Sequence, residues 1–246
     1  MRRCVIVGGA PIERAEELRA YLRADDYMIY CDCGLRHEKA LGRAPDLIVG
    51  DFDSHEDPHA AAETIVLPHV KDDTDSFFAA KEALRRGFRD FLLLGMTGAR
   101  LDHTLGNLAL MRMLDGAGAK ALLVDGYSET EIVSEEAAVT DAFPYFSLLP
   151  LGGAAKGVCV TDARFPLRDA ALAPDSSLGV SNEPLPGKIA RIRVGEGKLL
   201  LVRVKRGENE KNSARAGRSS FLRSKGAQKM FLYAGASHIA AQAASE

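Results

Sequence analysis

Aspartate residues recur directly after short apolar runs, and these carboxylates are the side chains best placed to do chemistry. Asp32 follows YMIYC, Asp51 and Asp53 follow DLIVG, Asp102 follows FLLLGMTGAR, and a further acidic group at 72–75 follows TIVLP. If the apolar runs are parallel strands of one sheet, their carboxyl ends share the edge where ligands bind in such folds. The sequence therefore predicts an acidic cleft assembled from distant segments.

Local spacing adds detail at two of these places. Asp51 and Asp53 point to the same side of an extended segment, because side chains alternate there. The pattern KDDTDSFFAAKEAL predicts a helix that begins near Asp72 or Asp73, where a carboxylate caps free backbone N–H groups, with Asp72 and Asp75 on roughly one face. Any one of these aspartates could equally have only a local turn or capping role. The prediction of a site rests on their recurrence at successive strand ends.

A cluster of carboxylates indicates a bound cation, because like charges repel strongly in a partly desolvated cleft. Oxygen ligands favour Mg²⁺ over zinc, and proteins usually hold Mg²⁺ with one or two carboxylates together with substrate phosphates. Lys71 and Arg100 lie in the same loops and are suited to phosphate oxygens. These residue types together predict phosphoryl or pyrophosphoryl transfer from a nucleotide.

A competing metal pattern, H-E-x-x-H, occurs at His55, Glu56 and His59. It binds zinc only when both histidines lie on one helix. Here Asp57 and Pro58 predict an N-cap followed by the first helical residue, which leaves His55 outside the helix. We therefore expect no zinc site in this segment. The P-loop pattern G-x-x-x-x-G-K-[ST] does not occur in the sequence.

The elements that must position these residues change character along the chain. Residues 1–126 alternate apolar strand-like runs with helical spacing, which predicts a mainly parallel, Rossmann-like α/β domain covered on both faces. The helical segments are 13–24, 75–87 and 101–118. Residues 127–205 contain short β-rich runs between Gly and Pro turns, which predict an all-β domain. Residues 206–246, rich in Lys, Arg, Ser and Gly, predict a mobile tail.

Composition limits the class of protein. The 246 residues are 46% hydrophobic, which is ample for a core, and the formal net charge of −2 gives no basic excess for nucleic-acid binding. Cys4, Cys31, Cys33 and Cys159 have neither disulfide-framework nor zinc-ribbon spacing. The N-terminal segment resembles neither a signal peptide nor a membrane span. We expect a cytoplasmic protein with free thiols and with no nucleic-acid or membrane partner.

Four motifs, in their order and spacing, resemble the thiamine pyrophosphokinase family. They are GDFDS at 50–54, KDDTD at 71–75, TGARLDHTLGNL at 97–108 and SNE at 181–183. The resemblance covers about residues 4–205. It implies Mg²⁺-dependent transfer of pyrophosphate from ATP to the thiamine hydroxyl, giving thiamine diphosphate and AMP. It also implies an α/β domain joined to a β-sandwich that binds thiamine, and a homodimer with active sites between subunits.

The resemblance implies roles for individual residues. We expect the catalytic set to be Asp51, Asp53, Lys71, Asp72, Asp75, Arg100 and Asp102, with Asp51, Asp53 and Asp75 as ligands of Mg²⁺. ATP contacts are expected from Asp32, Ser54, Thr74 and His103, and thiamine contacts from Ser181 and Asn182. Asp73 falls at a variable position of the family pattern and is left out.

The chain departs from the family pattern at three points. Cys33 replaces the middle glycine of Asp-Gly-Gly at 32–34, and Ala99 replaces that of Gly-Gly-Arg at 98–100. A lost glycine matters where the backbone needs a positive φ. The chain has no tryptophan, so any stacking on thiamine that other members obtain from Trp must come from another residue or be absent.

Two other functions are compatible with the residues. The first is an aspartate-dependent phosphatase that uses Asp51 as its nucleophile. The second is a non-catalytic nucleotide or thiamine sensor. Thiamine-dependent formation of AMP distinguishes the pyrophosphokinase from both.

Overall fold

Six parallel strands form the part of the fold that carries the acidic loops. The computed structural model describes residues 2–51, 62–70 and 72–206, all within one compact unit that ends at Gly207. The strands are β1 (Cys4–Val7), β2 (Tyr27–Cys31), β3 (Leu47–Gly50), β4 (Glu63–Val66), β5 (Asp90–Leu94) and β6 (Lys120–Val124). They lie in the order β4-β3-β2-β1-β5-β6, and each neighbouring pair is parallel. Each corresponds to one of the predicted apolar runs.

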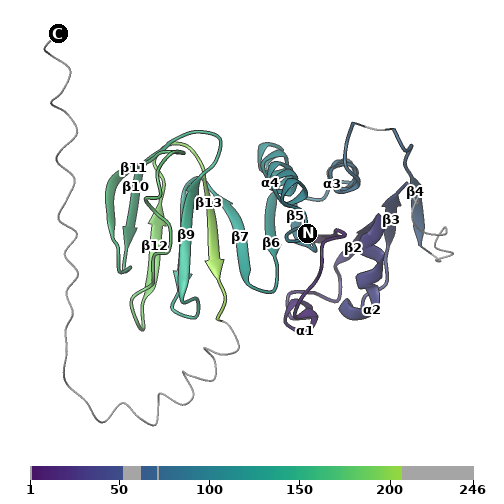
Figure 1. Ribbon diagram of the computed structural model, residues 1–246, viewed down its shortest axis with the longest axis horizontal. Helices are drawn as coiled ribbons and strands as arrows, with labels where there is room; N and C mark the ends of the chain where they lie inside the picture. The colour runs from purple at the N-terminus through teal and green to yellow at the C-terminus, as the bar shows by residue number, and fades with distance from the viewer. Residues whose placement is uncertain (1, 52–61, 71, 207–246) are drawn as a thin grey trace, which may run out of the picture. The chain divides into compact units, whose positions relative to one another are not determined.

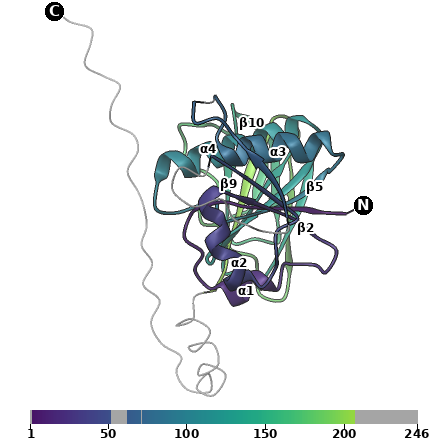
Figure 2. The same ribbon diagram turned by 90° about the vertical axis from the view of Figure 1, so that its right-hand side faces the viewer.

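Helices cover both faces of this parallel region, as Figure 2 shows. They are α1 (Ala15–Arg19), α2 (Glu38–Leu41), α3 (Asp75–Arg85) and α4 (Leu101–Gly116), with a 3₁₀ helix, η1 (Asp32–His37), directly after β2. Along β1, Ile6 belongs to the apolar cluster that contains Leu110 of α4, while Val7 belongs to the cluster that contains Leu18 of α1. Burial on both faces explains why the strands are nearly continuous apolar runs.

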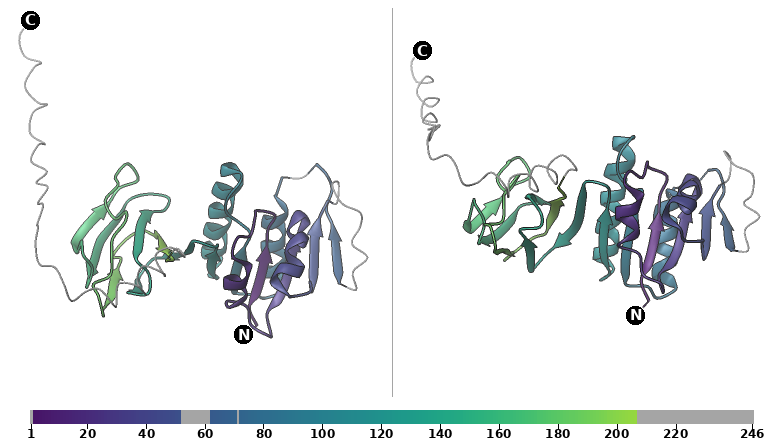
Figure 3. Two further views of the ribbon diagram at one scale, coloured as in Figure 1. Left: turned by 60° about the horizontal axis from the view of Figure 1, so that its bottom comes forward. Right: turned by 90° about the horizontal axis from the view of Figure 1, so that it is seen from below.

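Three antiparallel strands extend the same sheet, and four more form a second sheet (Figure 1). The extension consists of β7 (Ser128–Val133), β13 (Leu199–Val204) and β9 (Tyr145–Pro150), giving nine strands in all. The second sheet contains β11 (Leu167–Leu172), β10 (Ala155–Thr161), β12 (Ile189–Arg193) and β8 (Glu136–Thr140), in that order. No helix occurs between residues 128 and 206, the last residue described (Figure 3). The chain therefore has a mixed α/β fold with one large sheet and one smaller antiparallel sheet.

Strand β13 contributes to two separate cores. Leu199 and Leu201 pack in a cluster with Val158 of β10 and Ile192 of β12, between the two sheets. Leu200, on the opposite face of β13, belongs to the cluster formed with α3 and α4. Alternation of side chains along a strand allows one segment to connect both cores.

The predicted first helix is wrong in length. Spacing predicts a helix over 13–24, but α1 covers only Ala15–Arg19. Arg3 Nη2 donates to the carbonyl oxygen of Tyr21 at 2.5 Å, and the backbone N–H of Arg23 donates to the Asp26 carboxylate at 2.7 Å. Arg3 also forms a buried ion pair with Asp26 at 2.7 Å. These tertiary bonds occupy backbone groups that a longer helix would use for itself.

None of the helices in the described parts of the chain is long and apolar enough to cross a membrane.

Candidate active site

A cavity of about 400 Å³ lies at the carboxyl ends of β1, β2, β3 and β5. The loops after these strands line it, together with the first turns of α3 and α4. Six predicted site residues contribute to its wall, namely Asp32, Asp51, Thr74, Asp75, Arg100 and His103. The parallel sheet thus brings together residues that lie far apart in the sequence, at the edge where the strand-end argument places them.

Other predicted site residues lie elsewhere. Asp72, Asp102, Ser181 and Asn182 do not line this cavity. Asp53, Ser54 and Lys71 fall outside the described residues, and so do His55, Glu56 and His59 of the H-E-x-x-H pattern. The predictions for those six residues stay predictions.

Asp32 adopts an uncommon backbone conformation at the cavity wall. Its φ is +39°, and its Oδ2 accepts a hydrogen bond from the Cys33 thiol at 3.0 Å. That bond raises the pKa of Cys33. Oδ1 of Asp32 is buried and has no hydrogen-bond partner within the described part of the chain. A buried carboxylate oxygen without a donor is costly unless a cation or a ligand hydroxyl satisfies it.

Asp51 follows β3 and is largely buried, with 17% of its side chain exposed. Nδ1 of His69, which lies in the loop after β4, is 3.5 Å from Asp51 Oδ2. This contact becomes an ion pair when the imidazole is protonated. The sequence analysis did not single out His69, because no spacing pattern connects it to Asp51.

The start of α3 corrects the predicted helix cap. The helix begins at Asp75, and Thr74 is its N-cap, with the side chain accepting from the Phe77 backbone N–H at 3.4 Å. The predicted start near Asp72 or Asp73 is therefore wrong. The Asp73 carboxylate pairs instead with Lys81 at 2.6 Å. Threonine is a favoured N-cap residue, and Asp75 in the first turn interacts favourably with the helix dipole.

Arg100 and Asp102 form a pair at the start of α4. Arg100 Nη2 donates to Asp102 Oδ2 at 2.5 Å, and Nε donates to Oδ1 at 3.2 Å. These hydrogen bonds lower the pKa of Asp102 to about 2, so its carboxylate is charged at neutral pH. Both side chains are about two-thirds exposed. Arg100 lines the cavity, whereas Asp102 balances its charge from outside the lining.

Three side chains hold the loop between β5 and α4. Thr97 donates to Asp125 at 2.8 Å, the Asn107 amide donates to the carbonyl of Met96 at 2.7 Å, and Thr104 accepts from the backbone of Gly98 at 3.2 Å. Within this loop Ala99 has a φ of +56°. The alanine that replaces a family glycine is thus in the left-handed region, at a cost of roughly 1–2 kcal/mol. Cys33 does not adopt a positive φ.

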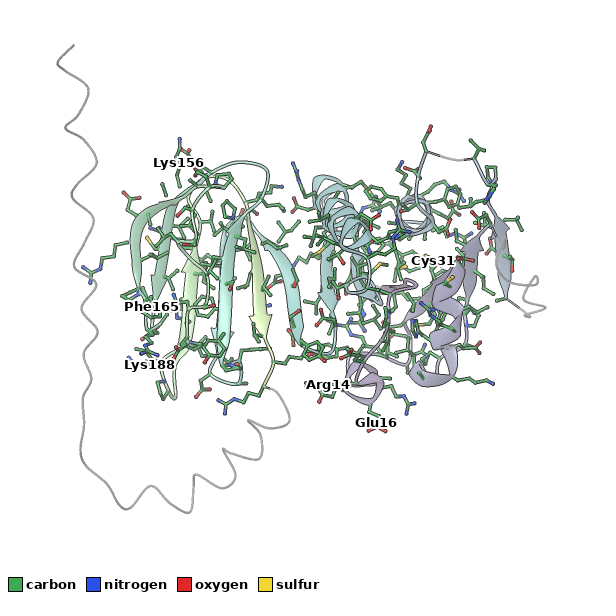
Figure 4. All side chains as sticks on the ribbon, viewed as in Figure 1. Arg14, Glu16, Cys31, Lys156, Phe165 and Lys188 are labelled. Carbon is green, nitrogen blue, oxygen red and sulfur yellow. The ribbon has the colours of Figure 1, made fainter. Side chains whose placement is uncertain are left out.

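Asn182 is in the region after β11 and is buried, with 4% exposed. Its Nδ2 donates to the carbonyl of Phe165 at 2.7 Å, and its Oδ1 accepts from the backbone N–H of Phe165 at 3.0 Å and of Glu183 at 2.8 Å. Phe165 is 55% exposed, and the guanidinium of Arg164 lies 5.5 Å from the centroid of its ring. Figure 4 labels Phe165 beside the second sheet. Ser181 has a φ of +58°. Asn182 therefore fixes a loop that presents an exposed aromatic ring.

Family models match both halves of the chain. The model for the thiamin pyrophosphokinase catalytic domain matches residues 18–123, and the model for the thiamin pyrophosphokinase vitamin B1 binding domain matches residues 129–199. The chain belongs to the thiamine pyrophosphokinase family. The resemblance stated from the four motifs is thereby confirmed.

Individual thiamine pyrophosphokinases are similar over nearly their whole length. The enzyme of Bacillus subtilis is 26% identical over 212 residues, which cover 82% of this chain and 99% of the relative. Its crystal structure superimposes with a TM-score of 0.74, covering 83% of this chain and 99% of the other. The enzyme of Geobacillus thermodenitrificans is 27% identical with a TM-score of 0.72, covering 84% and 99%.

The thiamine pyrophosphokinase motifs leave out several residues of the cavity wall. The loop after β1 contributes Gly8, Gly9 and Ala10. A Cβ on Gly8 would lie 2.7 Å from the carbonyl oxygen of Gly95, so only glycine lets the loops after β1 and β5 approach this closely. The signal in the sequence is the pair of glycines directly after the run CVIV. Acidic residues do not mark this loop, so the carboxylate pattern does not point to it.

Proposed function

We propose that this chain catalyses Mg²⁺-dependent transfer of pyrophosphate from ATP to the hydroxyl of thiamine, giving thiamine diphosphate and AMP. The single observation that carries the proposal is the cavity at the strand ends, where Asp32, Asp51, Asp75 and Arg100 meet. The family membership of both halves of the chain supports the same reaction. Its chemistry requires a site that combines oxygen ligands for a cation with basic groups for phosphates.

In this proposal, the two halves of the chain bind different substrates. Residues 1–126 form a Rossmann-like nucleotide and Mg²⁺ domain, and residues 127–205 form a β-sandwich that binds thiamine. The predicted tail, residues 206–246, lies outside the described residues except for Arg206. The parallel strands with helices on both faces support the first assignment. The apolar cluster shared by the two sheets supports the second. The extension of the large sheet through β7, β13 and β9 joins the halves covalently and by hydrogen bonds.

The residues at the cavity fit a magnesium ion. Oδ1 of Asp32 has no hydrogen-bond partner in the described part of the chain, and Asp51 and Asp75 line the same cavity. Among the described residues, no group of three or more His, Cys, Asp or Glu side chains is placed to hold a metal ion by itself. Proteins usually hold Mg²⁺ with one or two carboxylates, and substrate phosphates and water supply its other ligands. We assign Asp51, Asp53 and Asp75 as its ligands; the ion would neutralise phosphate charge.

The protein's own residues position the reacting groups. Arg100 donates two hydrogen bonds to Asp102, and its guanidinium is suited to bind phosphate oxygens. We assign phosphate binding to Lys71 as well. The thiamine hydroxyl oxygen bonds to the β-phosphorus of ATP as the bond between that phosphorus and the α,β-bridging oxygen breaks. AMP leaves and the hydroxyl proton passes to solvent, with no covalent enzyme intermediate. A loose transition state of this kind needs positioning more than it needs a base.

The thiamine-binding element lies in the loops that Asn182 holds. Ser181, Asn182 and the exposed ring of Phe165 form this element, and Phe165 supplies an aromatic face in a chain without tryptophan. None of these three residues lines the nucleotide cavity. We therefore assign a homodimer in which the thiamine-binding element of one subunit completes the cavity of its partner.

The activity is tested by incubating the protein with ATP, Mg²⁺ and thiamine. Equal amounts of AMP and thiamine diphosphate support the proposal. Orthophosphate release that does not require thiamine would instead identify a phosphatase. Thiamine binding measured by calorimetry without any turnover would identify a sensor.

The shared active site is tested by mixing two inactive variants. Asp51→Asn removes a cavity residue, and Phe165→Ala removes part of the thiamine-binding element. If each site combines two subunits, then random heterodimers contain one intact site, and mixing restores up to about a quarter of wild-type activity. A mixture as inactive as its components, in a solution of dimers shown to exchange subunits, would contradict the shared site.

A further inference from the structure

Arg36 is a basic residue of the cavity wall that none of the four motifs contains. It lies in η1, directly after β2, and is exposed. Its Nη2 donates to the backbone carbonyl oxygen of Gly9, which also lines the cavity. Within the described part of the chain, no carboxylate forms an ion pair with Arg36. Its positive charge is therefore bound to a neutral acceptor beside an acidic cavity.

Arg100, the second arginine of the cavity wall, already has a carboxylate partner. Arg100 makes two hydrogen bonds to the Asp102 carboxylate, which balances its charge. An anion that binds Arg100 must share it with this carboxylate. An anion that binds Arg36 displaces only an uncharged carbonyl acceptor, and both partners of the new hydrogen bond are then charged. Of the two described arginines of the cavity wall, Arg36 is thus the one whose charge an entering anion can use without breaking an ion pair.

The backbone that carries Arg36 is firmly placed. His37, the next residue, is buried, and its Nε2 lies 2.9 Å from the carbonyl oxygen of Ala10. A Cβ on Gly34 would lie 2.3 Å from the carbonyl oxygen of Val7, so η1 packs directly against the end of β1. Because β1 lies between β2 and β5, Arg36 and Arg100 extend from opposite sides of the β1 loop. Two guanidinium groups therefore border the same space from two directions.

We propose that Arg36 binds the phosphate groups of the nucleotide, exchanging its hydrogen bond to the Gly9 carbonyl for bonds to phosphate oxygens. This inference rests on the proposed function and adds a residue outside the family motifs to its nucleotide site. A guanidinium can donate two parallel hydrogen bonds to a phosphate, which a single carbonyl cannot accept in the same geometry.

Calorimetry with a non-hydrolysable ATP analogue tests the proposal. Binding of α,β-methylene-ATP with Mg²⁺, and separately of adenosine, is measured for the wild type, Arg36→Ala and Arg36→Gln. The glutamine amide can still donate to the Gly9 carbonyl but carries no charge. We expect both variants to bind the analogue about tenfold or more weakly, because a charge-assisted bond is lost, and to bind adenosine within about twofold of the wild type.

Arg19→Ala is the matched control. Arg19 is also exposed and donates through its guanidinium to one backbone carbonyl, that of Ala40 at 2.6 Å, but it does not line the cavity. Its loss should leave both affinities unchanged.

Four results would overturn the inference. If Arg36→Gln binds the analogue as tightly as the wild type does, Arg36 serves only to hold Gly9. If a variant binds the analogue and adenosine with equally reduced affinity, the substitution has disturbed the loop as a whole. If the wild type binds neither ligand, the proposed function fails together with the inference. If the wild type binds the analogue and turns over substrate while both Arg36 variants match it, only the inference fails.

Discussion

The cavity wall and the loop around Asn182 use their polar side chains in opposite ways. At the cavity, Asp32 keeps a buried carboxylate oxygen that no donor within the described residues satisfies. At the loop, the side chain of Asn182 makes three hydrogen bonds, all to the backbone of Phe165 and Glu183. The first region retains bonding capacity for a ligand. In the second region, the polar side chain uses its hydrogen bonds to hold the protein's own backbone in place.

This difference separates effects on activity from effects on stability. A polar group that holds a ligand is replaceable without loss of folding, because the fold does not depend on its bonds. A buried polar group that satisfies backbone groups leaves them unpaired when it is removed, which costs folding free energy. The substitutions below test whether each region behaves as its hydrogen bonds predict.

The largest effect is expected from Asp51→Asn. We expect kcat/KM to fall by roughly 10²–10⁴-fold, because charge stabilisation of this kind is a large part of catalysis. The free energy of unfolding should change by less than about 1 kcal/mol, since the residue lies at the edge of the cavity. Activity is measured by AMP formation at saturating and at limiting Mg²⁺, and stability by urea denaturation.

Asp73→Asn is the control for this substitution. Asp73 bonds Lys81 at the surface and does not line the cavity, so its loss should leave turnover within about twofold. Wild-type turnover of Asp51→Asn at limiting Mg²⁺ would remove Asp51 from the assigned metal ligands.

Asn182→Ala should show the reverse behaviour. The substitution leaves the N–H and C=O of Phe165 and the N–H of Glu183 without their partner, so we expect a loss of roughly 2–4 kcal/mol in the free energy of unfolding. Affinity for the ATP analogue should stay within about twofold, because the residue does not line the cavity. Urea denaturation and calorimetry measure the two quantities.

The neighbouring residue provides a contrast. Ser181→Gly removes a small side chain from a residue with a φ of +58°, where glycine is favoured, and should not destabilise the protein. An Asn182→Ala protein as stable as the wild type, or one that loses nucleotide binding, would contradict the division between the two regions.

The sequence was sufficient to predict that the acidic loops meet. Strands that are apolar on both faces are buried in parallel sheets, and the ends of such strands share an edge. These two rules place Asp32, Asp51 and Asp75 at the same edge as Arg100, and all four line one cavity. Every permutation of a parallel sheet keeps the carboxyl ends on one side, but which of these loops are neighbours along that edge depends on the strand order.

Features set by long-range contacts could not be predicted. The first helix is short because Arg3, far away in the sequence, binds the carbonyl of Tyr21. The sequence also does not predict that β7, β13 and β9 belong to the large sheet. Alternation along a strand shows which of its faces is buried, but it does not show which strand lies beside it. Strands β8 and β11, EAAVT and LRDAAL, contain few apolar residues, so the sequence gives little pattern from which to predict them.

The helix cap was missed for a local reason. Four consecutive residues at 72–75, Asp, Asp, Thr and Asp, are all good capping residues, so residue type alone does not select one. The ion pair between Asp73 and Lys81 and the cavity position of Asp75 leave the role to Thr74.

A smaller effect is expected from Ala99→Gly in the cavity wall. Ala99 has a φ of +56°, which costs an alanine roughly 1–2 kcal/mol, while glycine loses roughly 0.4–1 kcal/mol more entropy on folding. We therefore expect a net gain of up to about 1 kcal/mol in the free energy of unfolding. Ala117→Gly, at the other end of α4 with a φ of −85°, should instead lose stability. Equal losses in both variants would show that the loop stores no strain.

The smallest effect concerns His37, a polar group of the cavity region that already has a partner. Burial lowers its pKa in the folded protein, with the charge of Arg36 acting in the same direction. The unfolded chain, with a histidine pKa of about 6.5, therefore binds more protons in the window just below that pH, and folding stability falls as the pH falls through it. The stability that unprotonated His37 contributes to folding is fully present above about pH 6.5.

Urea midpoints measured between about pH 7.5 and 5 should decrease for the wild type over this window. His37→Gln keeps an amide that can donate to the Ala10 carbonyl but has no proton to gain, so its midpoints should vary less with pH. Asp102, with its pKa of about 2, titrates below this window. Identical pH profiles would mean that His37 ionises as readily in the folded protein as in the unfolded chain. Its contact with Ala10 would then not resist protonation.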